Sequence, residues 1–507
     1  MFIRQKKNKS GSLSVQLVDK SQGKYRVLET IGCSSDAHGV QRLLQEAERR
    51  IEALTGQSLM NFEIRREEAL IDVFVSGLEG LKLVGPELVL GKVFDEIGFN
   101  QVSSPLFRTL VLTRLIYPGS KLKTVEYLHR VQGESIGVDR IYRFMDRYHK
   151  KHMNAVQQTS YEHTISVHGG SVNVVFYDVT TLYFESESPD DLRKAGFSKD
   201  GKHSNPQIVL GLLVNEDGYP LAFDIFEGDK YEGHTLFPVV SGFKEKYKLA
   251  SLTVVADAGL LSKKNMADLD EAGFCFILGG RPKNESEEIR QKICALELKN
   301  GESTELKGQN GYRIIISYSE KRASKDAWNR ERGFEKLKKG VKSGKFTKKH
   351  LNNRGYNKYL KLEGDIAISI DEEKYKEDGK WDGLKEYITN ADLPKEKVID
   401  QYRNLWKIER TFRISKTDLK VRPVYHRLQR RIEAHISIAF CAYKVYKEVE
   451  RQLVQDKCTL SVEKLLEVLS SIYEITFVAP YSKTKMKRLL IQNQEQRNAL
   501  QFFKIEF

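Results

Sequence analysis

Two aspartates follow apolar stretches of the sequence, where a carboxylate is costly to bury. The stretch VNVVFYDVTTLYFE alternates apolar and polar side chains up to Asp178, which predicts a strand that ends at this acid. The stretch SLTVVADAGL likewise predicts a strand that runs into Asp257. A buried carboxylate needs a partner, and a metal ion is one such partner. A lone aspartate of this kind is more often a turn or helix-cap residue, so the metal interpretation depends on other acids in comparable places.

A third acid, Glu409, lies in the segment YRNLWKIERTFRISKTDLK, which predicts one helix. Tyr402, Glu409 and Lys416 are spaced by seven residues and would share a face of that helix. Arg413 and Lys420 would continue its charged side. An adjoining apolar stripe would pack the helix against a sheet: Leu405, Ile408, Phe412 and Leu419. A surface salt bridge is the alternative for Glu409 taken alone.

Carboxylates that converge at one edge of a sheet repel one another unless a cation neutralises them. Carboxylate and water oxygens suit Mg²⁺, with Mn²⁺ as a substitute, and a pair of such ions lying about 3.5–4 Å apart performs phosphodiester chemistry. The three acids therefore predict a two-metal site.

The charge of the chain favours a polyanionic partner. The 507 residues carry a net charge of +14, and the segment from Lys321 to Lys361 holds fifteen Lys or Arg against three acids. Such a concentration is typical of a nucleic-acid contact surface, with a solvated helix face as the alternative. Five scattered cysteines without a CxxC pair disfavour disulfides and zinc. No apolar run is long enough to cross a membrane, which favours a cytoplasmic protein without a membrane partner.

The pattern along the chain predicts a mixed α/β protein. Residues 12–31 predict two strands with a turn at Ser21-Gln22-Gly23, and three meandering strands followed by helix-connected strands predict a mixed five-stranded sheet flanked by helices between residues 171 and 279. The predicted organisation is a hairpin-plus-helix module (1–60), a helical, DNA-binding module (61–165), the first part of the core (166–280), a basic insertion containing β-strands (281–390), core helices that carry Glu409 (391–450) and a helical C-terminal region (451–507).

As a set, the segments FYDVTTLYFE, VVADAGL and YRNLWKIERTFRISKTDLK resemble the motifs of bacterial insertion-sequence transposases of the DDE class. The resemblance covers roughly residues 170 to 445 and is to the branch with an RNase H-like core, a β-strand-rich insertion and a Y-R-E-K signature. It implies that Asp178, Asp257 and Glu409 bind the catalytic metals. The signature tyrosine, glutamate and lysine match Tyr402, Glu409 and Lys416, whereas its arginine position holds Leu405.

The resemblance further implies that the chain cuts an element at its terminal inverted repeats and joins it to target DNA, as a homodimer on double-stranded DNA at the bacterial nucleoid. Tyr402, Arg403, Arg413, Lys416 and Lys420 would bind the DNA, with Arg403 taking the role of the signature arginine. The phrase YPGSKLKT is a looser likeness in the N-terminal part of the chain.

Two alternative functions remain open. A metal-dependent nuclease on the same core would cut without joining, and a transposase-derived DNA-binding protein would do neither. Strand joining in the presence of Mg²⁺ separates the three functions. His203, Asn205 and Gln207 precede or begin a predicted strand and are interpreted as ordinary strand-entry residues.

Overall fold

The computed structural model describes residues 1–20, 23–55, 62–185, 188–198, 201, 204–308, 311–352, 355–363, 367–479 and 482–507. The described residues form two compact units, one of residues 1–81 and 474–489 and one of residues 82–473 and 490–507. The residues His203, Ser21 and Gln22, to which the sequence analysis gave roles, lie outside the described residues.

The first unit contains two small sheets and two helices. One sheet is an antiparallel meander of β1 (Phe2–Lys7), β2 (Leu13–Asp19) and β3 (Arg26–Ser34), packed against α1 (Ala37–Thr55). The other has the order β16-β15-β4, with β4 (Leu78–Leu83), β15 (Tyr473–Val478) and β16 (Lys485–Leu490), and α2 (Phe62–Ser76) precedes it. The strand β1 was not predicted, because the sequence MFIRQKK is dominated by basic residues and lacks a clear alternation of apolar and polar side chains.

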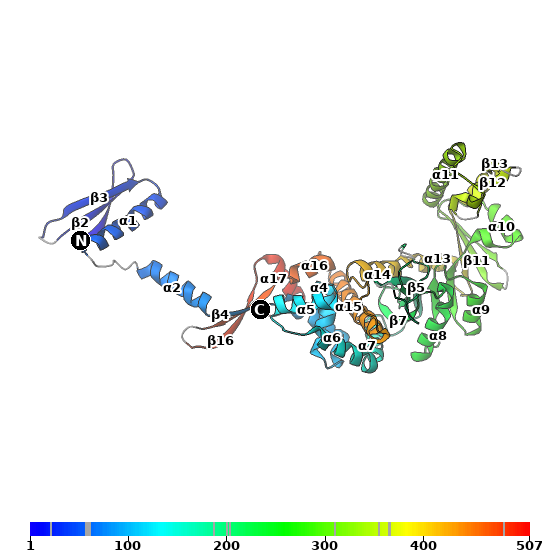
Figure 1. The fold of residues 1–507 in the computed structure, drawn as a ribbon, viewed down its shortest axis with the longest axis horizontal. Helices are drawn as coiled ribbons and strands as arrows, with labels where there is room; N and C mark the ends of the chain where they lie inside the picture. Colours follow the sequence, from blue (N-terminus) through cyan, green and yellow to red (C-terminus); the bar gives the residue numbers. More distant parts are fainter. Residues whose placement is uncertain are drawn as a thin grey trace. The chain divides into compact units, whose positions relative to one another are not determined.

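The second unit is built on an eight-stranded sheet with the order β10-β11-β14-β9-β8-β5-β6-β7 (Figure 1). Its strands are β5 (Val174–Tyr183), β6 (Gln207–Val214), β7 (Pro220–Glu227), β8 (Thr253–Ala256), β9 (Cys275–Gly279), β10 (Ser303–Lys307), β11 (Arg313–Tyr318) and β14 (Leu384–Thr389). The strands β5, β6 and β7 form an antiparallel meander, and β8 and β9 continue the sheet parallel to β5. This arrangement confirms the predicted five-stranded RNase H-like core.

Three strands from the predicted insertion extend this core sheet. The strand β14 pairs antiparallel with β9, and β11 and β10 follow it outward. The basic segment of the insertion forms the helix α11 (Glu320–Lys342), which is followed by the hairpin of β12 (Leu360–Glu363) and β13 (Ala367–Ile370) and by α12 (Glu372–Asp378). The β-rich insertion is therefore part of the core sheet as well as a basic helical extension.

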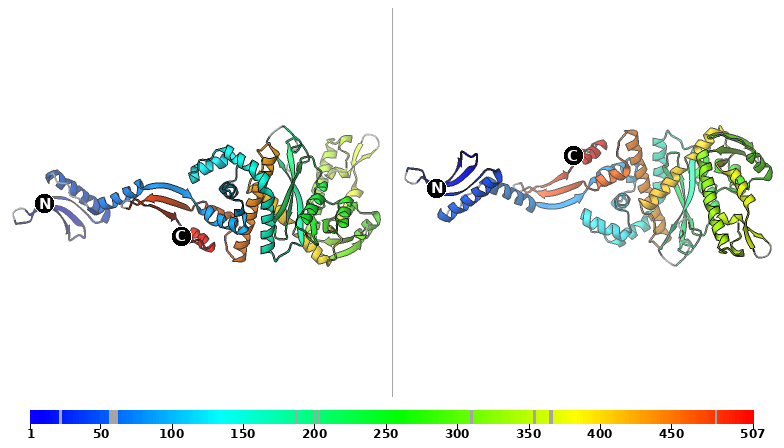
Figure 2. Two further views of the ribbon diagram at one scale, coloured as in Figure 1. Left: turned by 90° about the horizontal axis from the view of Figure 1, so that it is seen from below. Right: turned by 90° about the horizontal axis from the view of Figure 1, so that it is seen from above.

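Helices cover both faces of the sheet. One face packs against α8 (Leu236–Lys246), α9 (Lys263–Glu271) and α10 (Glu287–Cys294), and the other against α13 (Lys395–Arg403), α14 (Trp406–Thr417) and α15 (Gln429–Gln455). Figure 2 shows α15 between the sheet and a helical module. The module comprises α3 (Gly85–Ile97), α4 (Pro105–Ile116), α5 (Lys121–Gln132), α6 (Val138–Lys151), α7 (Met153–Val167), α16 (Val462–Leu469) and α17 (Gln494–Phe502).

The helix α15 holds the second unit together because it is buried on nearly all sides. Its apolar residues join the sheet core and the helical module into one continuous hydrophobic cluster. Within the described residues, no helix is both long enough and apolar enough to span a bilayer.

Candidate functional site

The sheet register brings Asp178 and Asp257 level with each other on adjacent strands. The strands β5 and β8 run parallel, and their last paired residues are Tyr177 and Ala256. Asp178 and Asp257 occupy the next position in this register. Because side chains alternate along a strand, both acids belong to the face that carries Phe176, which is the face covered by α13, α14 and α15.

The surroundings of Asp178 differ from those predicted. The strand β5 does not end at this acid but continues to Tyr183, because Val179, Thr180 and Thr181 are β-branched residues that pair with β6. The prediction for Asp257 is confirmed, since β8 ends at Ala256. Both aspartates are half-buried.

Each aspartate is oriented by a local backbone hydrogen bond. An Oδ1 oxygen of Asp178 accepts from the amide of Val179 at 2.7 Å, and Oδ1 of Asp257 accepts from the amide of Gly259 at 2.8 Å. Bonds of this kind fix the direction of a carboxylate.

The third predicted acid lies on a helix over the same face. The predicted single helix is two helices, because the chain makes tight turns at Asn404 and Leu405 between α13 and α14. Tyr402 belongs to α13, whereas Glu409 and Lys416 belong to α14, so the prediction of one shared helix face is wrong. The helix α14 packs on β5, and the Glu409 side chain is exposed.

Tyr402 links this helix pair to the aspartate edge of the sheet. A β-carbon on Gly279, the last residue of β9, would collide with the Tyr402 hydroxyl, so the close approach requires glycine. Burial raises the pKa of the Tyr402 phenol, and the charges of Asp257 and Glu409 add to this effect. The buried tyrosine therefore remains a neutral hydrogen-bond donor beside two of the three acids.

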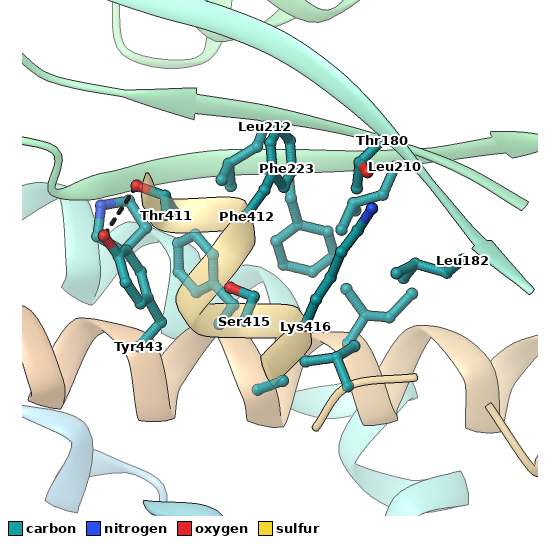
Figure 3. A pocket seen from close by; sticks show the side chains of 15 residues that line it. Thr180, Leu182, Leu210, Leu212, Phe223, Thr411, Phe412, Ser415, Lys416 and Tyr443 are labelled. Carbon is teal, nitrogen blue, oxygen red and sulfur yellow. Dashed lines mark hydrogen bonds between the residues drawn. The ribbon is translucent and has the colours of Figure 1, made fainter. Parts of the chain in front are cut away.

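Lys416 extends over β5 from the last turn of α14. Figure 3 shows its side chain reaching toward Thr180, which lies two residues from Asp178 on the same strand face. The cavity that these residues border has a volume of about 30 Å³, roughly that of one water molecule. Its walls are mainly apolar, so it separates the helix from the sheet without offering room for a ligand.

Two cations near this face were not singled out from the sequence. Lys385 on β14 lies on the same strand face as Tyr387, and its Nζ atom lies 4.3 Å from the centre of the Tyr402 ring. Burial lowers the pKa of Lys385 to about 8, with Arg322 of α11 and Arg403 adding to this effect and Glu409 opposing it. The basic insertion thus brings positive charge to the acid-bearing face. The sequence LKEYIT indicates a strand but does not alternate cleanly, so it gave no local signal for the face on which Lys385 lies.

The remaining predicted DNA-binding residues are exposed. The Nη1 atom of Arg403 lies 3.3 Å from the Oδ1 atom of Asp400 on the same helix, and the side chain of Arg413 is exposed on α14. Lys420 lies beyond the end of α14 with a φ of 44°, and its carbonyl oxygen accepts a hydrogen bond from Arg114. Leu405, where the resemblance implied an arginine, is 7% exposed and packs into the core.

The predicted metal ion requires oxygen ligands, which the carboxylates of this site supply in part. Among the described residues, no group of three or more His, Cys, Asp or Glu side chains is arranged to hold a metal ion. Mg²⁺ in phosphoryl-transfer sites is commonly held by one or two carboxylates together with water and substrate phosphates. Asp178 and Asp257 fit that kind of partial donor set, in which all ligands are oxygens.

A fourth acid close in sequence to Lys385 lies on the opposite face of the sheet. Glu386 is 1% exposed, and neither carboxyl oxygen has a hydrogen-bond partner among the described residues. Burial, with Glu285 nearby, raises its pKa from 4.5 to about 8. The native chain therefore keeps a proton that the unfolded chain loses, and this contribution to stability is full below pH 4.5 and is lost as the pH rises through 8.

We expect Glu386→Gln to flatten this pH dependence. The amide cannot ionise, so at about pH 8 the variant should be more stable than the native chain by ~2 kcal/mol. Urea unfolding between about pH 5 and pH 9 measures the effect. The exposed Glu373→Gln is the matched control, and equal pH profiles for both variants and the native chain would contradict the assignment.

Residues 170–444, more than half of the chain, match the family described as the transposase DDE domain. No curated protein matches the chain.

Solved structures give weaker similarities. A piggyBac transposase synaptic complex with hairpin DNA aligns over 76% of each chain, with 9% identity and a TM-score of 0.38. A Mos1 transposase paired-end complex with the left transposon end covers 34% of this chain and 58% of that chain, with 8% identity and a TM-score of 0.16. A Mos1 mariner paired-end complex with Mn covers 47% and 74%, with 10% identity and a TM-score of 0.15. These similarities are too low to assign residues or activities.

Proposed function

Because the chain belongs to the transposase DDE domain family, we propose that it cuts DNA at the ends of a mobile element and joins those ends to target DNA. The observation that carries the proposal is the register of β5 and β8, which aligns Asp178 with Asp257 on the face covered by α14. In the proposal, Asp178, Asp257 and Glu409 form the catalytic acids. Double-stranded DNA with terminal inverted repeats is the substrate, and a homodimer brings two ends together.

The two aspartates and Glu409 would hold Mg²⁺, or Mn²⁺ in its place, in a pair of sites completed by water and DNA oxygens. A pair of bound ions would activate the attacking hydroxyl and stabilise the leaving oxygen. The protein's own contribution is to orient the carboxylates through the amides of Val179 and Gly259. The amides lie one residue after Asp178 and two residues after Asp257, so each carboxylate is oriented by its own stretch of backbone.

The cations around the acids support DNA as the substrate. The charges of Arg322 and Arg403 lower the pKa of Lys385, which the charge of Glu409 raises. Lys385 lies over the Tyr402 ring, and Lys416 extends over β5 close to Asp178. In the proposal, these four cations bind phosphates on either side of the scissile bond, with Arg413 of α14 and Lys420 beyond the end of that helix contacting the DNA further away. Tyr402 donates its phenolic hydrogen to a DNA oxygen near Asp257.

The first experiment uses purified protein and a labelled duplex that carries the ends of the element flanking the gene. With Mg²⁺ we expect both cleavage at the ends and joined products, and with EDTA we expect neither. Cleavage without joining would favour a nuclease. Binding without either reaction would indicate a DNA-binding protein that has lost its catalytic function.

A further inference from the structure

A basic cavity of about 540 Å³ lies in the second unit, away from the acid-bearing sheet face. One wall is the start of α5, the sequence PGSKLK of residues 118–123, and the other is the segment from Lys420 to His426 that follows α14. The residues that line it include Arg114, Lys121, Lys123, Lys420 and Arg422 but no Asp or Glu. We call this site the basic cavity.

Two of these cations are buried without an acid. Arg114 is 3% exposed, and among the described residues its guanidinium donates to neutral acceptors, the carbonyl oxygens of Leu419 at 3.4 Å and Lys420 at 3.5 Å and the Nδ1 atom of His435 at 3.5 Å. Lys121 is 4% exposed, and its ammonium has no hydrogen bond or ion pair with any residue in the described part of the chain. Buried charges are normally paired, since removing an ion from water costs several kcal/mol. An anion from outside the chain would supply the counter-charge that these two cations lack.

The electrostatics of the basic cavity point the same way. Burial, together with repulsion from Arg114, holds the pKa of Lys121 well below its ordinary value. Lys121 is also the first residue of the twelve-residue helix α5, where the helix dipole disfavours a cation and favours an anion. Burial lowers the pKa of His426 to about 3, so this lining residue is a neutral polar group at neutral pH.

The position of the basic cavity relates it to the acids. The amide of Val424 donates to the carbonyl of Tyr183 at 3.2 Å, which ties the 420–426 wall to the end of β5. Five residues of strand separate Asp178 from Tyr183, a distance of roughly 17 Å. That distance corresponds to about five base pairs along a duplex. The exposed ring of Tyr425 lines the same cavity, and such a ring can stack on a nucleobase.

We propose that the basic cavity binds a phosphate of the DNA backbone, about five base pairs from the bond that is cut. That the phosphate belongs to DNA rests on the proposed function. That the cavity binds a phosphate rests on Arg114 and Lys121. A DNA strand fits better than a free phosphate ion, because the cavity is far larger than one phosphate and has an aromatic ring within it. The phrase YPGSKLKT, which the acid site does not use, supplies one wall.

The test measures duplex binding in EDTA, so that it needs no catalysis. Lys121→Met and Lys420→Gln are each expected to weaken binding roughly fivefold near 0.15 M salt, and to reduce the slope of log K against log salt by about one. Arg130→Gln is the matched control, because Arg130 is exposed on the last turn of the same helix and does not line the basic cavity. Lys121→Met should also raise the Tm, since it removes an unpaired buried cation.

Titration with inorganic phosphate distinguishes the sources of the anion. A Tm that rises with phosphate in the native chain but not in Lys121→Met, together with weakened DNA binding by the variant, supports the proposal. A phosphate effect with unchanged DNA binding would overturn the DNA assignment in favour of a free phosphate. If Lys121→Met and Lys420→Gln both bind DNA as Arg130→Gln does and phosphate has no effect, the inference fails, whether or not the native chain cuts and joins DNA.

Discussion

Replacing Glu409 with Gln is expected to slow metal-dependent DNA cleavage and joining by at least ~10³-fold while DNA binding persists. Glutamine keeps the shape of the side chain but removes the charge that a metal ion requires, and a loss of ~4 kcal/mol of transition-state stabilisation corresponds to this factor. The Glu409 side chain is exposed on α14, so the substitution should leave the Tm unchanged. Single-turnover cleavage of a labelled element end, with binding measured in parallel, gives both quantities.

The matched control for this prediction is Glu396→Gln. Glu396 is an exposed acid on the neighbouring helix α13, where its Oε1 atom lies 4.0 Å from the Nζ atom of Lys395. Asp178→Asn and Asp257→Asn should reproduce the loss, since the three acids act as one unit and their effects do not add. A Glu409→Gln variant that cuts and joins as fast as Glu396→Gln would remove Glu409 from the catalytic acids and leave the aligned aspartates to be explained by other chemistry.

Local sequence patterns predicted the centre of the sheet but not all of its boundaries. The apolar runs before Asp178 and Asp257 predicted β5 and β8, because buried parallel strands are rich in β-branched residues. The end of β5 was predicted five residues too early, since an acid was interpreted as a strand end although β-branched residues follow it. The pairing of β5 with β6 on one side and with β8 on the other stabilises the strand by more than the half-buried carboxylate of Asp178 destabilises it.

The break between α13 and α14 could not be predicted from the sequence, for a different reason. At Asn404 and Leu405 the chain uses hydrogen bonds from residue i to residue i−3, such as Leu405 to Tyr402 and Ile408 to Leu405. Such a tight turn keeps the right-handed winding, and the apolar stripe continues almost in phase through it. The buried state of the stripe was therefore predicted correctly, with Leu405, Ile408, Phe412 and Leu419 all in the core, while the helix boundary was not.

The cations from the insertion could not be placed from local patterns. Lys385 reaches the acid-bearing face because β14 pairs with β9. The paired residues Tyr387 of β14 and Gly279 of β9 are far apart in the sequence. Periodicity predicts that a segment forms a strand, whereas its neighbour in the sheet depends on long-range packing. The same limit applies to the basic cavity, whose two walls come from opposite ends of the second unit's sequence.

Replacing Leu405 with Arg, the residue that the resemblance to the Y-R-E-K branch implies at this position, is expected to destabilise the second unit by about 3–5 kcal/mol. The Leu405 side chain is 7% exposed and packs in the same hydrophobic cluster as Ile408 and Phe412. An arginine there would bury a charge without a counter-ion and would lose the packing of the leucine. Urea unfolding of both proteins measures the difference, and Leu405→Met, which conserves volume, should cost less than about 1.5 kcal/mol.

The alternative outcome for this substitution would change the account of the site. If Leu405→Arg unfolds as the native chain does and cuts DNA faster, the arginine must extend from the start of α14 toward the acids, and the leucine at this position limits the activity of the native chain. If it is unstable as expected, the core at this position excludes an arginine. A phosphate contact here then falls to cations that already lie on the acid face. They include Lys385, whose Nζ atom lies 4.3 Å from the centre of the Tyr402 ring, and Arg403, whose charge lowers the pKa of Lys385. Cleavage by Lys385→Gln, a variant that keeps the strand intact, would then fall although Leu405 is untouched.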